Sequence, residues 1–442
     1  MTPGARDLWL LPLGGCGEIG INMNLYGRDG QWLMVDCGIG FERNTTTTRV
    51  FTAAADFIAS RRDRLTGLLV THAHEDHVGA VAHHWPQLRC PVFCTRFTAR
   101  ILQHKLAEAG IADQVRVQIV ETGERHTVGP FDIEWVGLTH STPESQALVI
   151  SAENGAIFHT GDWKLDPEPI VGPTYDAEAL KRIGDRGILA MVCDSTSATV
   201  DGWSVSEGVL RKSLVKHVAA APGRVVVAGF GSNIARLVTL ATVAVDSGRY
   251  PGIRGRSVES YYRSARACDL WPAELELIRP DHLGYLPPQE VFAIATGSQG
   301  EAGAALSRLA RGDHPAMELS EGDTVIFSAR VIPGNEKALE ALYTALQARG
   351  VRVITDAEPG APIPASGHPA REELKAMYGW IRPGIAVPVH GEPHHLDAHA
   401  ALTRALGVPV SLNGRNGDLF MLAPTPGIRR GAAPVGRVVL DR

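Results

Sequence analysis

Short apolar runs separated by turn residues are typical of the first part of the chain. Residues 8–13, 22–26 and 31–35 predict strands, and Asp29-Gly30 between the last two indicates a β-hairpin. These alternating runs place one face of each strand against a core. The N-terminal region is therefore expected to be mostly β-sheet.

The pattern then becomes mixed. Helical periodicity over residues 51–62 predicts a helix, and the apolar run 65–70 predicts a buried strand. Further strands are expected over 115–120, 131–137, 147–151, 156–159 and 188–193. Strands that alternate with helices and turns predict a layered α/β or α+β domain.

From residue 206 onwards the alternation is that of βαβ units. Helices are expected over 206–221, 234–247, 302–311, 336–350 and 372–381, and strands over 225–228, 291–295, 324–327, 351–355 and 385–389. Residues 424–442 are rich in Pro, Gly and Arg, which predicts one ordered strand and a loose tail. No repeat with a solenoid period is present.

Composition and charge are those of a globular protein. At ~150 residues per domain, the chain of 442 residues corresponds to about three domains. The hydrophobic fraction of 44% and the charged fraction of 21% are sufficient for a large core. The net charge of −5 excludes a globally basic nucleic-acid coat and is compatible with a local basic groove.

Cysteine usage and hydropathy bear on location. The six cysteines are scattered, unlike a disulfide framework. Cys90 and Cys94 have nearly the spacing of zinc ligands, but no second pair completes the set, so two core residues are the favoured interpretation. No run approaches the ~20 apolar residues of a membrane span. We expect a soluble, cytoplasmic protein with no membrane partner.

A glycine-rich segment follows the first predicted strand. Residues 15–20, Gly-Cys-Gly-Glu-Ile-Gly, match a dinucleotide-binding fingerprint, and Asp36 lies near its acidic position. That interpretation requires a helix to begin at the loop, whereas residues 22–35 predict a hairpin. A turn with positive φ, or backbone amides lining a catalytic cleft, are the other interpretations.

The strongest chemical signal comes directly after the apolar run 65–70. The segment from His72 to His77, His-Ala-His-Glu-Asp-His, concentrates histidines and carboxylates that are costly to bury without a counter-charge. In a loop leaving a strand end, His72 and His74 reach one cation while Asp76 and His77 reach another. Imidazole with carboxylate suits zinc. This density disfavours the alternative of a solvated polar loop.

Two cations need more ligands than one loop supplies. His140, Asp162 and His390 each follow an expected strand. An aspartate can bridge the two ions of a binuclear hydrolase, and Asp162 is the candidate. Taken singly, each residue is as readily a hydrogen-bonded core or turn residue, but their shared position at strand ends favours a joint site.

These residues resemble a known family. The motifs are His72-x-His74-x-Asp76-His77, His140 and Asp162, then Cys193-Asp194-Ser195-Thr196, Thr296-Gly297-Ser298-Gln299-Gly300-Glu301, Ile332-Pro333-Gly334-Asn335-Glu336, Ser366-Gly367-His368 and Pro388-Val389-His390-Gly391-Glu392. The first part is similar to binuclear hydrolases of the metallo-β-lactamase fold, and the whole set resembles the ribonuclease J branch of the β-CASP nucleases. The glycine-rich segment fits the same branch.

The resemblance implies a fold and a domain order. The fold class is α/β (α+β): a metallo-β-lactamase αββα sandwich with an inserted β-CASP α/β domain and the active site between them. The hydrolase domain is expected over residues 1–205 and again over 356–442, with the tail. The inserted domain is expected over residues 206–355.

The resemblance also implies an activity: zinc-dependent hydrolysis of RNA phosphodiesters in RNA processing and decay. His72, His74 and His140 would hold one zinc, Asp76, His77 and His390 the other, and Asp162 would bridge, with manganese as a substitute. His368 is expected to act on the phosphate or the leaving group, and Asp194 to orient a histidine. Asp36 is expected to hold in place the segment of residues 72–77, which we call the metal loop.

The substrate is expected to be single-stranded RNA with a 5′-monophosphate, degraded from 5′ to 3′ with internal cleavage as a second mode. The histidine at position 390 resembles RNA-processing members, whereas DNA-repair members tend to carry an apolar residue there. The candidates for RNA contact are Ser232, Asn233, Ser298, Gln299, Ser366 and His368, each of which is as readily a strand-end turn residue.

Three departures from the family and two rival functions complete the picture. Pro369 replaces a common alanine, Arg330-Val331 replaces a common Ser-Pro, and the longer bacterial members carry a C-terminal domain beyond residue 442. A homodimer or higher homo-oligomer is expected, by a mode that this last difference leaves open. The rivals are a small-molecule hydrolase of the same fold and a non-catalytic RNA-binding subunit.

Overall fold

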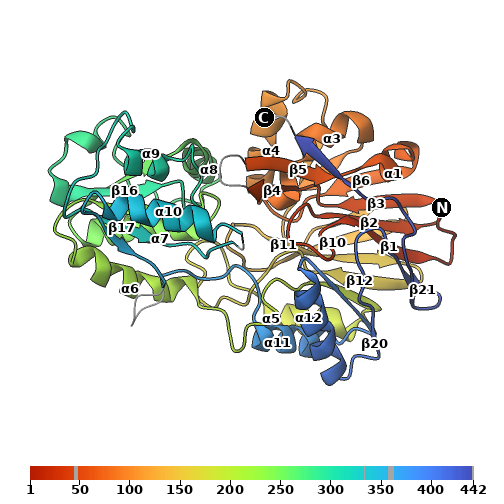
Figure 1. Cartoon of the computed structure of the whole chain (residues 1–442). Helices are drawn as coiled ribbons and strands as arrows, with labels where there is room; N and C mark the ends of the chain where they lie inside the picture. The colour runs from red at the N-terminus through yellow and green to blue at the C-terminus, as the bar shows by residue number, and fades with distance from the viewer. Residues whose placement is uncertain (44–47, 333, 357–362, 441–442) are drawn as a thin grey trace.

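The computed structural model describes residues 1–43, 48–332, 334–356 and 363–440 (Figure 1). Two large sheets form the centre of one lobe. The first has the order β22 (Gly427–Arg429), β21 (Leu419–Ala423), β1 (Leu8–Gly14), β2 (Met23–Arg28), β3 (Gln31–Val35), β6 (Leu65–Leu69), β7 (Val92–Cys94) and β8 (Val117–Ile119). The second has the order β20 (Val410–Ser411), β19 (Ile385–Val389), β13 (Ala190–Asp194), β12 (Gly155–His159), β11 (Gln146–Ala152), β10 (Phe131–Gly137) and β9 (Arg125–Val128).

The alternation of side chains along each strand builds the layers. Leu8 and Leu10 of β1 face the second sheet and share a core with Phe131 of β10, whereas Trp9 and Leu11 face the opposite side. Both faces are apolar because both are covered, which is why these strands are apolar at consecutive positions.

Helices cover the two outer faces. Apolar residues of α1 (Asp56–Ala59), α3 (Val81–Leu88) and α4 (Arg96–Glu108) belong to the core on the outer face of the first sheet. Those of α5 (Ala177–Asp185), α11 (Arg371–Ile381) and α12 (Pro393–Ala405) pack on the outer face of the second sheet. The result is a four-layer αββα sandwich, as the family resemblance implied.

A separate parallel sheet forms the second lobe (Figure 1). Its order is β15 (Tyr250–Arg254), β16 (Val291–Ala295), β14 (Val225–Ala228), β17 (Thr324–Phe327) and β18 (Arg352–Ile354). One face is covered by α6 (Glu207–Ala219), α7 (Ile234–Asp246) and α8 (Arg256–Ala267), and the other by α9 (Ala305–Arg311) and α10 (Glu336–Gln347). We call this part the inserted lobe, because strands on both sides of it in sequence build the sandwich.

A buried ion pair joins the segments that connect the lobes. Arg236 of α7 pairs with Glu207 at the start of α6, at 2.5 Å between Nε and Oε1. The same guanidinium donates to the carbonyl oxygens of Ser328 and Ile363. Both connections between sandwich and inserted lobe are thus held at one buried point. The predicted domain boundaries at 205 and 355 stay predictions, and residues 357–362 beside the second lie outside the described residues.

The helix predicted over residues 51–62 is wrong. Residues up to Ala53 belong to β5 (Thr48–Ala53), and only α1 and a 3₁₀ turn, Arg62–Arg64, follow. β5 pairs with β4 (Ile39–Arg43) and with the C-terminal strand β23 (Arg437–Leu440). Pairing with a strand from the other end of the chain overrides local helical periodicity. The C-terminal segment thereby contains two strands, β22 and β23, where one was expected.

The glycine-rich segment is a loop between antiparallel strands. β1 and β2 pair in antiparallel fashion, and no helix begins within residues 15–22, all of which the structure describes. This excludes the dinucleotide site, which needs a parallel βαβ unit. Gly15, Gly17 and Gly20 have φ values of 82, 89 and 90°, so the turn with positive φ is confirmed.

The remaining expectations concern cysteines and membranes. All six cysteines are free and buried. Cys90 and Cys94 belong to the core on the outer face of the first sheet, in accord with two core positions. Across the described ranges, none of the helices combines the length and the apolar character that a membrane crossing requires.

Candidate metal centre

The predicted ligands come together at the carboxyl ends of strands from both sheets. His72 follows β6, His140 follows β10, Asp162 follows β12 and His390 follows β19 directly. The rest come from the loop after His72 and the short helix α2 (Glu75–Val78). Two overlapping groups result, and in each the ligand atoms lie within 4.8 Å of one another.

The first group contains His72, His74, His140 and Asp162. The Nδ1 atom of His74 lies 3.1 Å from Nε2 of His72 and 3.0 Å from Nε2 of His140. Asp162 Oδ2 lies 3.9 Å from Nε2 of both His72 and His140. Three ring nitrogens and a carboxylate oxygen therefore converge on one point.

The second group contains Asp76, His77, His390 and the same Asp162. His77 Nε2 lies 3.2 Å from Asp162 Oδ2, and His390 Nε2 lies 3.1 Å from Asp76 Oδ2. Asp162 also reaches His390 Nδ1 through its other oxygen, at 3.2 Å. It is the member that both groups share, and its bridging of two ions stays a prediction.

Burial gives the two groups different electrostatics. It lowers the pKa of His74 to about 4, and it lowers those of His72 and His140 well below the usual range, so these imidazoles are neutral. In the second group burial opposes the charged form of Asp76, but His77 and His390 outweigh it and lower the pKa of that carboxyl. Converging neutral imidazoles and ionised carboxylates are donors that suit a divalent cation. The residues therefore fit metal binding.

A buried network holds the metal loop. Asp36 Oδ2 lies 2.8 Å from His77 Nδ1, so it can accept the proton of that nitrogen and leave Nε2 as the donor atom facing the centre. The Asp36 carboxylate also accepts from the backbone N–H and the hydroxyl of Thr71. Asn22 donates from Nδ2 to the carbonyl oxygen of Asp76. The supporting role expected for Asp36 agrees with these contacts.

Asp194 and His368 form a pair beside the shared aspartate. His368 Nδ1 lies 2.8 Å from Asp194 Oδ2 and 3.8 Å from Asp162 Oδ2. Burial opposes protonation of His368, but the Asp194 carboxylate outweighs it and raises the pKa of that imidazole. Asp194 is thus placed to orient this imidazole, and its role beside a metal stays a prediction.

Thr196 was not identified from the sequence. Its Oγ1 lies 3.0 Å from His390 Nδ1 and also donates to the carbonyl oxygen of His390. His390 has a φ of 52°, a backbone angle that residues other than glycine rarely adopt. Its N–H donates to Gly15 O at 2.6 Å. The glycine-rich loop therefore holds a predicted ligand. Its place as the last residue of the motif Cys193-Asp194-Ser195-Thr196 was the signal that could have indicated it.

The candidates for RNA contact fall into two places. Ser366 lies beside His368, and its Oγ accepts from the His368 N–H at 3.1 Å. Ser232, Asn233, Ser298 and Gln299 lie in the inserted lobe, in the turns after β14 and β16. These strands are parallel neighbours, so their carboxyl ends meet at one edge.

Two of these side chains have structural partners. Asn233 Oδ1 accepts from the N–H of Arg236 and caps α7. The Gln299 amide bridges the loop before α10, with Nε2 donating to Arg330 O and Oε1 accepting from Ile332 N–H and Asn335 Nδ2. Pro333, within the motif of that loop, lies outside the described residues. RNA contact stays a prediction for all six candidates.

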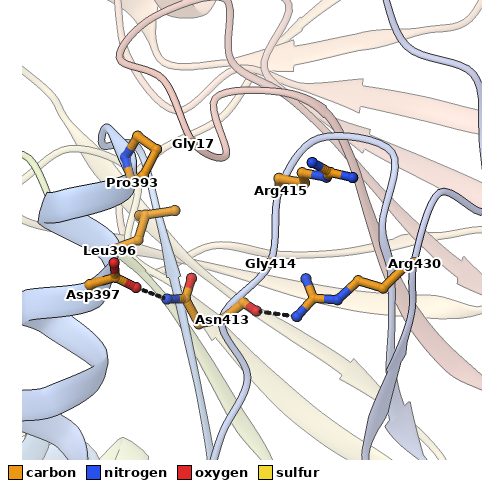
Figure 2. Close-up of a pocket in the computed structure, with 8 residues that line it drawn as sticks. All are labelled: Gly17, Pro393, Leu396, Asp397, Asn413, Gly414, Arg415 and Arg430. Atoms are coloured by element: carbon orange, nitrogen blue, oxygen red, sulfur yellow. Dashed lines mark hydrogen bonds between the residues drawn. The ribbon is translucent and has the colours of Figure 1, made fainter.

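Two pockets lie in the sandwich, one beside the ligand His140 and one beside the glycine-rich loop. The larger, of about 670 Å³, includes His140 in its lining, together with Val136, Leu138 and Ile183. The smaller, of about 490 Å³, lies between the start of α12 and residues 413–415, against Gly17 (Figure 2). There Asn413 donates to Asp397, and Arg430 donates to the carbonyl oxygen of Asn413. None of the predicted site residues lines the smaller pocket.

Three family models match parts of the chain. "Beta-lactamase superfamily domain" matches residues 31–180, "Ribonuclease J, beta-CASP domain" matches 222–346, and "Zn-dependent metallo-hydrolase RNA specificity domain" matches 361–412. Together with the αββα sandwich and the inserted parallel sheet, they define a metallo-β-lactamase-fold protein of the β-CASP class.

Similar proteins narrow this to a family. Ribonuclease J of Sinorhizobium meliloti is 44% identical over 442 residues, with 99% of this chain and 78% of that protein covered. Ribonuclease J of Mycolicibacterium smegmatis is 36% identical, with 100% and 79% covered, and that of Thermus thermophilus is 32% identical, with 98% and 77% covered. The chain belongs to the ribonuclease J family, as the motifs predicted.

A solved structure supports the fold alone. The crystal structure of a protein of unknown function from Enterococcus faecalis V583 superposes with a TM-score of 0.64 at 15% identity, over 94% of this chain and 100% of that chain.

Proposed function

We propose that this chain is a ribonuclease that uses two zinc ions to hydrolyse RNA phosphodiester bonds, with manganese as an alternative metal. The observation that carries the proposal is the pair of ligand groups joined by Asp162, at the carboxyl ends of strands from both sheets. Membership of the ribonuclease J family supports RNA as the substrate. The domain boundaries near 205 and 355 belong to the same proposal.

Each residue has a role in this proposal. His72, His74 and His140 hold one ion, Asp76, His77 and His390 hold the other, and Asp162 serves both. The ions supply positive charge for the phosphate and activate water. His368, kept in place by Asp194, donates a proton to the leaving oxygen or a hydrogen bond to the phosphate, and its raised pKa suits a proton donor near neutral pH.

The mode of cleavage and the substrate end are further parts of the proposal. Single-stranded RNA with a 5′-monophosphate is degraded from the 5′ end to mononucleotides, with internal cleavage as a second mode. The edge formed by Ser232, Asn233, Ser298 and Gln299 contacts phosphate or sugar oxygens, and Ser366 and His368 contact the RNA beside the metals. The protein acts as a homodimer or higher homo-oligomer in the cytoplasm, in RNA processing and decay.

One assay tests these statements together. Purified protein is incubated with 5′-monophosphorylated RNA labelled at either end, before and after treatment with a chelator, and products are separated by length. We expect mononucleotides from the 5′ end, loss of cleavage with chelator and recovery with zinc or manganese. Cleavage that survives complete metal removal would contradict the metal mechanism, and shortening from the 3′ end would contradict only the direction.

The rival functions lose support in the structure. A small-molecule hydrolase has no need of an inserted lobe with a polar edge or of the His368–Asp194 pair. A non-catalytic RNA-binding subunit has no need of two ligand groups, whose buried imidazoles and carboxylates cost free energy to assemble.

A further inference from the structure

A tyrosine of the inserted lobe contacts the metal loop of the sandwich. Tyr261 lies on α8, and its hydroxyl donates to the carbonyl oxygen of Ala73 at 2.8 Å. Ala73 stands between His72 and His74, so this bond fixes the peptide that joins two members of the first ligand group. Tyr261 is 6% exposed. A buried hydrogen bond of this kind resists displacement by water.

Helix α4 of the sandwich connects Tyr261 to the loop that carries His140, the third histidine of the first ligand group. Phe97 near the start of α4 packs against Tyr261, with the ring centroids 6.3 Å apart and the ring planes tilted by 50°. The Phe97 N–H donates to Glu144 Oε2 at 2.8 Å, in the loop that carries His140. The loop of Ala73 and the loop of His140 thus both meet the packed pair α4 and α8, which lie side by side in Figure 1.

Two more contacts brace this pair of helices. Lys105 of α4 pairs with Glu75, which stands between His74 of the first group and Asp76 of the second, at 2.5 Å between Nζ and Oε1. Arg96 donates to Ala267 O at the end of α8, at 3.0 Å. The helix pair is therefore attached to the metal loop at two points, Ala73 and Glu75.

The second ligand group is held differently. His390 is fixed by Gly15 and Thr196, and His77 by Asp36, which all belong to the sandwich. The supports described for these two histidines include no residue of the inserted lobe. The two groups share Asp162 but rest on different supports.

We propose that Tyr261 is a positioning residue, through which the inserted lobe sets the geometry of the first ligand group and not of the second. The proposal rests on the proposed function, because it takes the two groups to be metal sites. The affinity of the first group for its ion then depends on the placement of the inserted lobe. If substrate displaced this lobe, the affinity of the first group would change before that of the second.

The test compares Tyr261→Phe with Tyr262→Phe in the full chain. Both changes remove one hydroxyl and keep the ring, but the Tyr262 hydroxyl accepts from Arg266 on the same helix, at 3.4 Å. Zinc affinity is measured by competition with a chelator, and cobalt(II) titration follows the visible spectrum of each site. Removing a group that supports a metal ligand typically costs 10–100-fold in affinity. We expect a loss of that size at one site in Tyr261→Phe, no change at the other, and wild-type behaviour in Tyr262→Phe.

The outcomes separate the two proposals. Wild-type affinity at both sites in Tyr261→Phe, or an equal loss at both, would overturn the positioning role. Wild-type protein that takes up no zinc would instead overturn the proposed function. The unfolding temperature of each metal-free variant identifies a folding defect. If Tyr261→Phe has such a defect, Arg96→Ala is tested instead, because Arg96 lies at the exposed end of the contact between α4 and α8. We expect it to show a smaller loss of zinc affinity, confined to the same site.

Discussion

The sandwich and the inserted lobe both present polar side chains at the carboxyl ends of strands, but of different kinds. In the sandwich these are histidines and aspartates that face one another. In the inserted lobe they include Asn233 and Gln299, whose amides are bonded to nearby backbone. The same position in a strand thus serves chemistry in one region and local order in the other.

Buried charge shows the same difference. Arg236 and Glu207 of the inserted lobe balance each other at 2.5 Å. In the sandwich, Asp162 has its pKa lowered to about 2, because His390 and His77 outweigh the effect of burial. When a cation binds in place of the protons on those imidazoles, the same carboxylates stay ionised. The buried charges of the inserted lobe are thus balanced within the protein, whereas the ligand groups of the sandwich also fit a metal cation.

The largest expected effect comes from removing the second ligand group. Asp76→Ala combined with His77→Ala should abolish RNA cleavage and lower the bound metal by about one ion per chain, since two-metal hydrolysis needs both. Metal analysis and single-turnover cleavage provide the measurements. The fold should survive, because the cores of both lobes are unchanged.

The control for this pair lies in the inserted lobe. Asp281 and His282 are also adjacent, but both are exposed, and their side chains are 3.8 Å apart. Replacing both by alanine should leave metal content and cleavage unchanged. If the two double variants behaved alike, the contrast between the lobes would be wrong.

The sequence was sufficient for most of this architecture, and the exceptions share one cause. Strands 131–137, 225–228, 291–295 and 385–389 have the predicted bounds, because apolar runs between turn residues are local signals. The metal loop could be predicted for the same reason, because its histidines and aspartate lie close together in the sequence. Residues 51–62 were misassigned, since the strand there depends on pairing with residues 437–440.

The supports of the site were the part that the sequence could not show. Thr196 and Tyr261 are common residue types, and they matter only because folding brings them to His390 and Ala73. Asp36 could be proposed because it ends a strand beside the metal loop. Tyr261, on a helix of another lobe, left no such local signal.

A smaller effect is expected at His368. His368→Ala should retain metal and RNA binding while cleaving ~10²–10⁴-fold more slowly, the usual contribution of general acid–base catalysis. His394→Ala is the matched control, because that imidazole is exposed and lies at the start of α12. Wild-type turnover in His368→Ala would leave this histidine a structural role only. Loss of one metal would instead make it a ligand, which the group of Asp162, Asp194, His368 and His390 also allows geometrically.

The smallest effect separates the two roles of Asn233. Asn233→Ala removes the cap of α7 and should lower the free energy of unfolding by about 1 kcal/mol. In the wild-type protein the Arg236 nitrogen lies 2.9 Å from Asn233 Oδ1. Asn233→Asp keeps an oxygen acceptor at this place and should retain the wild-type free energy of unfolding. The added negative charge should nevertheless raise KM for RNA, with kcat unchanged, if the edge of the inserted lobe contacts phosphates. Thermal unfolding and steady-state kinetics on the two variants provide the measurements. An unchanged KM in both variants would confine Asn233 to helix capping and remove it from the RNA-binding edge.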